Sequence, residues 1–377
     1  MKTRYISLLL FAASVSLLLC FACAKPPLPK GDKEIAENSR LYSRGSFAVR
    51  HEDKLYFYEH GADTGVAYSV DINTGETFPL CGKPECLHND KNCNGHLTDA
   101  NGLPFLMVYN ERLYWIGWNA PDFTLYSMSL DATDKRVEFP LNKEYEALAI
   151  NGFAGIYDGV LYRWGSGETV SGGEIKSGTL FYSQSLEKGS EPRVIFQSEE
   201  GDKIVARMDG HMIYCASFFN QEDEARMQLR AYDMETDELR ELYNGDGMFG
   251  ARDMFVKDGQ LIFNGGDAVS YSLETGELKK LYNGEAVVYA TDDCIIEQSF
   301  SGGIKCYDHS GNLLCTAPFE AEGLDTNGVG IVGFGSIDGV FFYSLKPIEL
   351  EKRAYLVSFN TKTAEVKLLW SLSDWVK

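Results

Sequence analysis

Short apolar runs separated by turn residues recur along the chain after residue 45. One set of runs follows an Asp-Gly-type turn and is rich in Leu, Tyr and Phe on both faces, as expected for strands buried on both sides. Asp-Gly between apolar runs is a strong β-hairpin signal, because both central residues of the turn need positive φ. Seven such runs begin at residues 52, 110, 158, 209, 258, 292 and 338.

A second set of apolar runs accompanies the first, and each ends in a turn related to Thr-Gly-Glu that leads to a further short strand. Examples are "AYSVDINTGETFPL" from residue 67 and "VSYSLETGELKKLY" from residue 269. Each unit then has four strands, and successive units begin 34 to 58 residues apart, close to the length of a four-stranded blade.

This repeat predicts an all-β fold, a seven-bladed β-propeller of four-stranded antiparallel blades over residues 45–377. A β-sandwich or two smaller all-β domains is the alternative. The first unit starts with its own first strand and the last ends with its own fourth, so we expect no strand to be donated across the ends. Apolar contact between blades 1 and 7 would then close the ring, with Trp375 in the tail covering the seam.

The turns predict two unlike faces. The Asp-Gly and Thr-Gly-Glu turns are tight and lie on one face, whereas the connections between second and third strands and between blades lie on the other. Long variable segments fall on this second face, and binding usually resides on variable loops over a rigid scaffold. We expect the segments "GSGETVSGGEIKSG" from residue 165 and "NQEDEAR" from residue 220, and the cysteine-rich stretch after blade 1, to belong to this loop-rich face.

Composition narrows the class of partner. Among 377 residues, 44% are hydrophobic and 13% aromatic, which is ample for a packed core. The formal net charge is −20. An acidic chain without a basic stripe repels phosphate backbones, so we expect no nucleic-acid partner.

The N-terminus predicts export and a lipid anchor. Lys2 and Arg4 precede a fifteen-residue uncharged apolar stretch, which is typical of a signal peptide rather than a membrane span. Cys23 follows the small residue Ala22, as lipoprotein processing requires, whereas Cys20 follows a leucine. We therefore expect a signal peptide over residues 1–22, lipidation at Cys23 and a flexible tether over residues 23–44. A plain secretory signal is the alternative.

Lipidation would place the mature chain on the cell membrane, facing outside the cytoplasm. Several acyl chains on one cysteine hold a protein firmly on a bilayer, since a single chain is marginal. No second hydrophobic run of spanning length follows Cys23.

The stretch "CGKPECLHNDKNCNG" from residue 81 concentrates potential metal ligands. Cys81, Cys86, His88 and Cys93 can form a closed Cys3His tetrahedron of the kind that holds structural zinc. Disulfides persist in exported proteins, so a disulfide-stapled loop is the competing interpretation, and it leaves one thiol over. A third interpretation is that these thiols have another role or none. A catalytic Cys-His pair is disfavoured because no orienting partner is evident.

The same stretch partly matches an oxygen-ligand calcium loop through Asp90, Asn92, Asn94 and Gly95. The glutamate that normally closes such a loop is absent, because Asn101 stands at its position. A turn rich in Asn and Asp is the favoured interpretation.

The motif of Cys81, Lys83, Pro84 and the later ligands, placed after a first blade and a lipoprotein-type leader, resembles a known group. Bacterial surface lipoproteins, mostly of Gram-positive gut anaerobes, carry a β-propeller domain of unknown function with this pattern. A more distant similarity is to the Tol-Pal periplasmic propeller. The resemblance covers most of the chain and implies the fold and a surface location, but no activity and no catalytic residue.

Other residues offer weaker candidates. Cys215 is expected in the core of blade 4, and two of Cys294, Cys306 and Cys315 can pair across the strands of blade 6 or serve as small core residues. Aromatic side chains on a loop-rich face can stack on sugars, although packing is the commoner role of such residues on propeller strands. The aromatic candidates are Trp115, Trp118 and Trp164.

These features predict a membrane-anchored binding or scaffold module for a protein, peptide or glycan, acting through the loop-rich face. An assembly or sensor lipoprotein of the cell envelope is a related hypothesis. A carbohydrate-active or other hydrolytic enzyme that uses the central channel is the alternative. No G-x-S-x-G, H-E-x-x-H or Asp-box motif occurs in the chain.

Overall fold

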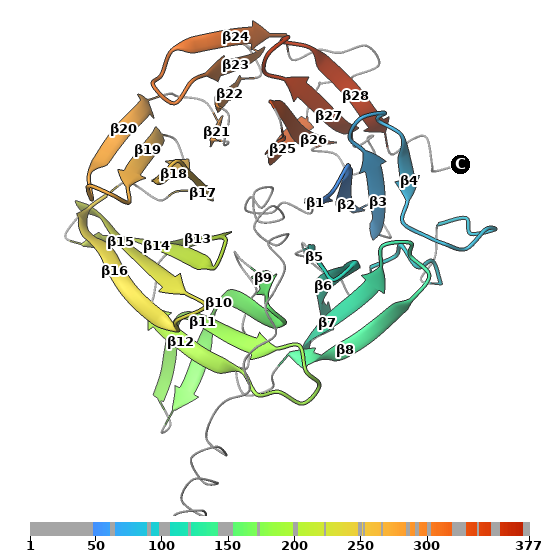
Figure 1. Ribbon diagram of the computed structural model, residues 1–377, viewed down its shortest axis with the longest axis horizontal. Coiled ribbons are helices and arrows are strands. Elements are labelled where there is room, and N and C mark those ends of the chain that lie inside the picture. Colours follow the sequence, from blue (N-terminus) through green and yellow to red (C-terminus); the bar gives the residue numbers. More distant parts are fainter. Residues whose placement is uncertain are drawn as a thin grey trace, which may run out of the picture.

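In the computed structural model, seven four-stranded antiparallel sheets surround a central axis as the blades of a propeller (Figure 1). The predicted fold class is confirmed. The structure describes residues 48–60, 65–88, 92–97, 106–119, 122–141, 154–171, 174–198, 203–221, 224–247, 251, 253–264, 267–283, 287–290, 294–299, 303–318, 329–337, 339–347 and 355–371. The predicted signal peptide, Cys23, the tether and Trp375 lie outside these residues.

Each sheet is formed by four strands that follow one another in the chain. Blades 1 to 3 contain β1 (Ala48–His51), β2 (Lys54–His60), β3 (Gly65–Asp71), β4 (Thr77–Pro79), β5 (Met107–Tyr109), β6 (Arg112–Asn119), β7 (Asp122–Ser129), β8 (Lys135–Leu141), β9 (Ala154–Tyr157), β10 (Val160–Ser171), β11 (Glu174–Ser185) and β12 (Arg193–Ser198).

Blades 4 to 7 follow the same plan. They contain β13 (Lys203–Asp209), β14 (Met212–Gln221), β15 (Glu224–Asp233), β16 (Glu238–Asp246), β17 (Asp253–Lys257), β18 (Gln260–Asn264), β19 (Asp267–Ser272), β20 (Leu278–Asn283), β21 (Val287–Ala290), β22 (Ile295–Ser299), β23 (Gly303–Tyr307), β24 (Leu313–Ala317), β25 (Val329–Ile337), β26 (Val340–Pro347), β27 (Tyr355–Asn360) and β28 (Val366–Ser371). Among the described residues, no helix is long and apolar enough to cross a membrane.

In blades 3 and 5, the turns between first and second strands have the backbone conformation that the Asp-Gly pattern predicts. In blade 3, Asp158 and Gly159 have φ values of 50° and 72°. Blade 2 makes the same turn without glycine, since Asn110 and Glu111 have φ values of 46° and 56°. Asparagine tolerates this region better than most residues, and the hairpin on either side fixes the conformation of Glu111.

The turns between third and fourth strands share a side-chain cap. In blade 1, the backbone amides of Asn73 and Thr74 donate to Asp71 Oδ1 at 2.9 and 2.8 Å. The hydrogen bond from the Thr74 amide is the main reason why the pKa of Asp71 lies below its usual value. Asp233 and Asn360 cap the equivalent turns of blades 4 and 7 in the same way.

Two segments expected as variable loops are instead paired strands. The strands β10 and β11 stay in register from the body of blade 3 out to the pair Ser171 and Glu174, so most of "GSGETVSGGEIKSG" forms a hairpin. In blade 4, β14 and β15 are paired out to Gln221 and Glu224. Backbone hydrogen bonding between two long strands satisfies the polar groups that a loop of this length would leave to water.

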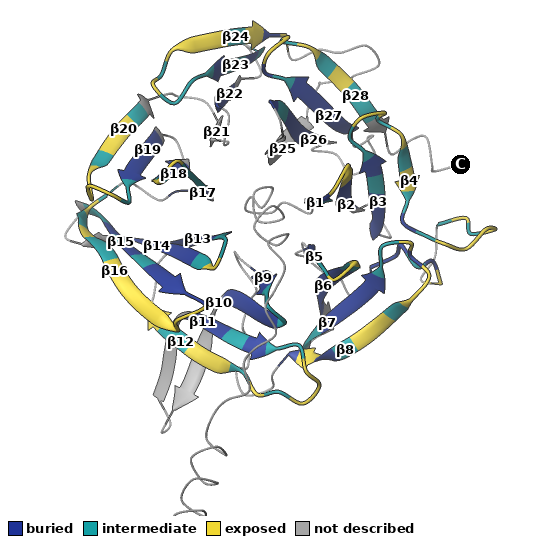
Figure 2. Ribbon diagram, viewed as in Figure 1, coloured by how far each residue is buried: buried dark blue, intermediate teal, exposed yellow. Residues whose placement is uncertain are grey.

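Burial decreases from the inner strands of each blade to the outermost strand (Figure 2). The apolar clusters lie between neighbouring blades, so a middle strand is buried on both faces. The cluster that joins the two ends of the ring brings Phe57 of blade 1 together with Phe342 and Leu356 of blade 7. Because every sheet uses only its own four strands, apolar contact closes the ring, as the sequence predicts.

Two phenylalanines of blade 1 allow a matched test of this packing. Phe57 is 1% exposed in the closing cluster and stacks on Tyr68, with ring centroids 5.4 Å apart, whereas Phe78 on β4 is 56% exposed. Phe57→Ala should lower the free energy of unfolding by about 3–5 kcal/mol. Phe78→Ala should change it by about 0.5 kcal/mol or less. Urea denaturation checks both values, and equal losses would contradict closure by this cluster.

Candidate metal centre

The candidate site is built on the connection that leaves blade 1. The outer strand β4 ends at Pro79, and Cys81 follows one buried leucine later. A turn closed by the Cys86 amide, which donates to the Lys83 carbonyl at 3.3 Å, reverses the chain. His88 has a φ of 56°, a left-handed conformation that directs its ring back over the turn.

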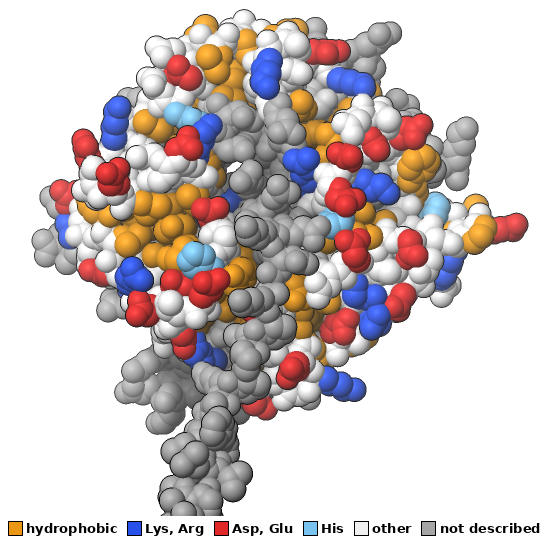
Figure 3. Space-filling model, in the orientation of Figure 1, with side chains coloured by type: hydrophobic (Ala, Val, Ile, Leu, Met, Phe, Trp, Pro, Cys, Tyr) orange, Lys and Arg blue, Asp and Glu red, His pale blue; other side chains and the backbone are white. Residues whose placement is uncertain are grey.

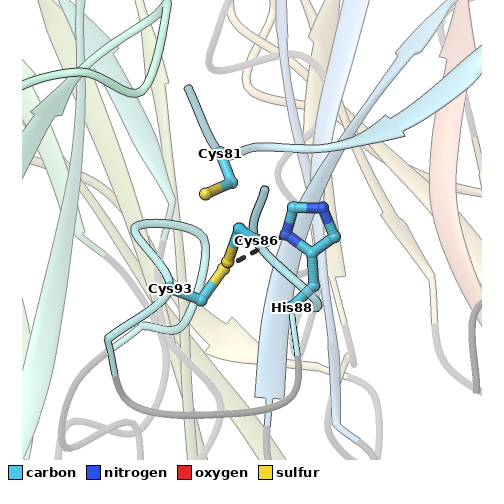
Figure 4. A group of neighbouring side chains, drawn as sticks. All are labelled: Cys81, Cys86, His88 and Cys93. Carbon is cyan, nitrogen blue, oxygen red and sulfur yellow. Dashed lines mark hydrogen bonds between the residues drawn. The ribbon is translucent and has the colours of Figure 1, made fainter. Parts of the chain in front are cut away.

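The four predicted ligands converge. The ligand atoms of Cys81, Cys86, His88 and Cys93 all lie within 4.8 Å of one another, and Figure 4 shows the four side chains gathered around one point. His88 Nδ1 lies 3.4 Å from Cys93 Sγ. Cys93 is buried, and the other three are partly exposed. We call residues 81–88 and 92–97 the knuckle.

Backbone pairing ties the end of the knuckle to blade 1. The Ala67 amide donates to the Gly95 carbonyl at 2.7 Å, and His96 forms an antiparallel bridge with Val66 of β3. A Cβ on Gly95 would lie 2.8 Å from the Leu80 carbonyl oxygen, so only glycine fits this close approach. The segment after Cys93 therefore pairs with the part of β3 that β4 leaves uncovered and completes this edge of the blade 1 sheet.

The knuckle also contacts blade 2. The Asn94 side-chain amide donates to the Ala132 carbonyl in the turn between β7 and β8. Lys135 Nζ donates to the His96 carbonyl and lies 5.9 Å from the centre of the Trp115 ring. The sequence placed this stretch on the loop-rich face. Its contacts in blade 2 are instead with a tight turn, because the knuckle follows the outer rim of the seam between the blades (Figure 1).

The pKa values of the Cys81 and Cys93 thiols are shifted in opposite directions. Burial opposes ionisation of Cys81, but hydrogen bonds from the Lys83 and Asn94 amides and from the neighbouring thiols lower its pKa overall. Burial, the charge of Cys81 and the Cys86 thiol raise the pKa of Cys93 to about 12. Burial lowers the pKa of His88, so its imidazole is neutral at pH 7 and able to bind a metal.

This donor set fits zinc. All three cysteines of the knuckle are free thiols in this structure. In a zinc tetrahedron with metal–sulfur bonds of about 2.3 Å, the sulfurs lie about 3.8 Å apart, which requires only a small contraction here. Thiolates and imidazole select zinc over calcium, magnesium or manganese, which prefer oxygen ligands. Four protein ligands leave no open position, so such a metal is structural.

The calcium interpretation finds no support in the described part of its motif. Asn94 uses its amide to hold blade 2, and Gly95 is packed against the backbone. Asp90 and Asn101 lie outside the described residues.

The aromatic candidates serve packing where the structure describes them. Trp115 is fully buried and stacks on Tyr126, with ring centroids 5.4 Å apart. Trp164 is 2% exposed and packs against Phe181 and Phe196. A ligand on the surface cannot reach either ring, so neither residue forms a sugar platform. Trp118 belongs to β6, and its side chain lies outside the described residues.

Sequence reasoning missed the partners of the knuckle in blade 2. Ala132 accepts through its backbone carbonyl, which no side-chain pattern reveals. Lys135 is one of many lysines in the chain, and its role follows only from the distance between blades. The sequence signal for this contact was limited to Asn94 and Gly95, which the calcium pattern had singled out for another reason.

The fold is a seven-bladed propeller, and the site is a thiol-rich cluster whose geometry could hold a metal ion. No protein-family model matches the chain, and no curated protein matches it. Solved structures do resemble it. One is the β-propeller domain of the Trilobed protease from Pyrococcus furiosus, which is described as having an open velcro topology. Its TM-score is 0.51 at 9% sequence identity, and the match covers 89% of this chain and 98% of that domain.

Two further solved structures are enzymes. An acylaminoacyl peptidase in complex with a chloromethyl ketone has a TM-score of 0.55 at 10% identity over 90% of this chain. The chain spans only 54% of the length of that peptidase. An oligogalacturonate lyase in complex with manganese has a TM-score of 0.51 at 13% identity, covering 88% of this chain and 91% of the lyase. At these identities the likeness shows the fold alone.

Removal of one ligand should abolish metal binding. We expect the purified chain to contain one zinc ion, and Cys93→Ser to contain none. At free zinc about a thousandfold above the dissociation constant, binding contributes about 4 kcal/mol to stability, so a chelator should lower the melting temperature clearly. Because three thiols must lose protons while His88 is already neutral, zinc uptake at pH 7 should release about two to three protons and strengthen with pH.

Elemental analysis, thermal melts and calorimetry in two buffers measure these quantities. Cys215→Ala is the matched control, because Cys215 is a buried cysteine of blade 4 far from the knuckle in sequence and in the fold. It should keep one zinc per chain. If the purified wild-type chain contained no metal, and neither zinc nor a chelator changed its melting temperature, the zinc centre would be excluded.

Proposed function

We propose that this protein is a lipid-anchored, extracytoplasmic binding or scaffold module, built on a propeller whose first two blades are joined by a structural zinc. The observation that carries the proposal is the convergence of Cys81, Cys86, His88 and Cys93 into a closed donor set. A closed site contributes rigidity rather than chemistry. The one cluster of metal ligands found among the described residues is therefore suited to support a surface rather than a reaction.

The position of the knuckle indicates what the zinc would stabilise. Cys93 lies beside the backbone that pairs with Ala67 of blade 1, and Asn94 contacts Ala132 of blade 2. Fixing Cys93 to the earlier ligands would hold both contacts in register. The seam between blades 1 and 2 then resists shear, and the surface around it is held in one conformation before a partner binds, which lowers the entropy cost of binding.

The proposed location rests on the leader. Lys2, Arg4 and the apolar stretch that follows favour export, and Ala22 before Cys23 favours lipidation. A tether of about twenty residues would lift the propeller off the bilayer. The surface chemistry suits a protein or glycan partner better than a polyanion: on the face shown in Figure 3, the described acidic and basic side chains are interspersed.

An enzyme that uses the channel is the second candidate, favoured by one comparison. The oligogalacturonate lyase is covered over 91% of its length, so the shared fold accounts for nearly the whole of that enzyme. The lyase structure is described as a manganese complex, whereas the ligands gathered in the knuckle are mainly thiols, which do not favour manganese. This difference favours the binding role for the present chain.

The anchor can be tested by cell fractionation. The wild-type chain should enter the membrane fraction and a detergent phase, because several acyl chains on Cys23 give firm attachment. Cys23→Ser should lose the lipid mass and appear mostly in the soluble extracytoplasmic fraction. Cys20→Ser is the matched control and should behave as wild type. Intact mass of the mature chain reports which cysteine carries lipid.

The binding role is tested on the same preparations. Cross-linking on intact cells should recover a partner in constant ratio to the wild-type chain, or a glycan array should retain the zinc-loaded protein. Hydrolysis or elimination of a polysaccharide that disappears with one Asp or Glu substitution would instead establish the enzyme. The experiments test location and binding separately. A protein that stays in the soluble fraction but binds a partner would therefore contradict the proposed lipid anchor and leave the proposed binding role intact.

A further inference from the structure

Three cysteines outside the knuckle meet on blade 6. Cys306 lies on β23 directly opposite Cys315 of β24. Cys294 stands two residues before Ile296, the partner of Cys306 on β22, so it shares the same face of the sheet. All three belong to the apolar cluster between blades 6 and 7.

The three sulfurs are in contact through the middle one. Cys294 and Cys315 both lie close enough to Cys306 to raise the pKa of its thiol. Cys294 and Cys306 are fully buried, and Cys315 is partly exposed. Cys315 Sγ also donates to the Thr361 carbonyl of blade 7 at 3.1 Å. The row of thiols therefore begins in the core and ends at a group that an external reagent can reach.

We propose that Cys306 and Cys315 form a reversible disulfide, with Cys315 as the entry point and an exogenous disulfide as the oxidant. The register selects this pair. Residues directly opposite each other on antiparallel strands have Cα atoms about 4.5–5.5 Å apart, within the range that a disulfide bridges. Cys294 and Cys306 are diagonal neighbours at about 7–8 Å, which is too far without backbone movement.

The reaction has two thiol–disulfide exchange steps. The Cys315 thiolate attacks one sulfur of the external disulfide, which breaks its S–S bond, forms a mixed disulfide and releases one thiolate. Deprotonated Cys306 then attacks Cys315 Sγ and releases the second thiolate. Two protein thiols lose two protons and two electrons, and the external disulfide becomes two thiols.

The modification changes how blades 6 and 7 are joined. The sulfur of a cysteine in a disulfide carries no proton, so oxidised Cys315 can no longer donate a hydrogen bond to the Thr361 carbonyl. Thr361 keeps its own hydrogen bonds to Gly339 through its amide and hydroxyl, each at 2.8 Å. Oxidation therefore exchanges one contact between blades for a covalent bond within blade 6. Burial raises the pKa of Cys315, which keeps this thiol protonated near neutral pH and slows its reaction.

Peptide mapping of the zinc-loaded full chain in glutathione redox buffers tests the pairing. Trypsin cleaves after Lys305, which separates Cys294 from a fragment, residues 306–352, that contains both other thiols, because the bond between Lys346 and Pro347 resists trypsin. The expected product is this fragment two hydrogens lighter, and further cleavage before Asp308 should leave the pieces that carry Cys306 and Cys315 joined. The oxidised chain should melt a few degrees higher than the reduced chain, because the bond restricts the unfolded state.

Cys294→Ala should retain the linked fragment, and Cys306→Ala should abolish it. If Cys306→Ala fails to fold, Cys315→Ser provides the same test at a partly exposed position. A link between Cys294 and Cys306, or fully reduced thiols at the most oxidising glutathione ratio, would overturn the proposal. The knuckle cysteines lie in other tryptic fragments, so this result stands apart from the presence of zinc.

Discussion

The structure depends on burial between blades. No single blade has a core of its own, since its two faces become apolar interior only when neighbours cover them. The second and third strands carry most of this burial, with residues such as Leu55, Leu113 and Leu161 fully enclosed. The least stable interface between neighbouring blades therefore limits the stability of the ring. These interfaces, or seams, differ in the contacts that stabilise them.

Three of the seams between blades are stabilised by three different kinds of contact. Blades 7 and 1, where the ends of the chain meet, rely on apolar packing around Phe57 and Phe342. Blades 3 and 4 add polar contacts across the seam, in which Arg193 binds both Asp237 and the Tyr232 hydroxyl. Blades 1 and 2 are joined by the knuckle, whose backbone pairs with the sheet of blade 1 and whose Asn94 side chain donates to the tight turn of blade 2.

The fold follows from the sequence because it repeats a local rule. Asp158 and Gly159 adopt positive φ, and Asp71 caps its turn, for reasons contained in a few neighbouring residues. The hairpin of β10 and β11 was missed for the converse reason. Its glycines and polar residues are typical of a loop, and only the pairing of two long strands makes them extended.

The candidate site divides in the same way. Spacing alone was enough to bring Cys81, Cys86, His88 and Cys93 together, because a chain reversal over so few residues leaves little choice. The contacts of the knuckle with blade 2 could not be predicted from the sequence, because Lys135 and Ala132 belong to another blade and packing brings them close. Trp115 shows the same limit: its side chain is fully buried by the seam, which no local pattern records.

The two groups of cysteines illustrate how backbone context decides the chemistry of a thiol. In the knuckle, a reversing chain directs four side chains inward, and backbone amides lower the pKa of Cys81. This geometry favours a cation. In blade 6, extended strands place Cys306 directly opposite Cys315. The neighbouring Cys294 thiol and burial raise the pKa of Cys306, and burial raises the pKa of Cys315. Such a geometry has room for two sulfurs bonded to each other, but not for four ligands around a metal. We therefore propose a metal for the first arrangement and a disulfide within blade 6 for the second.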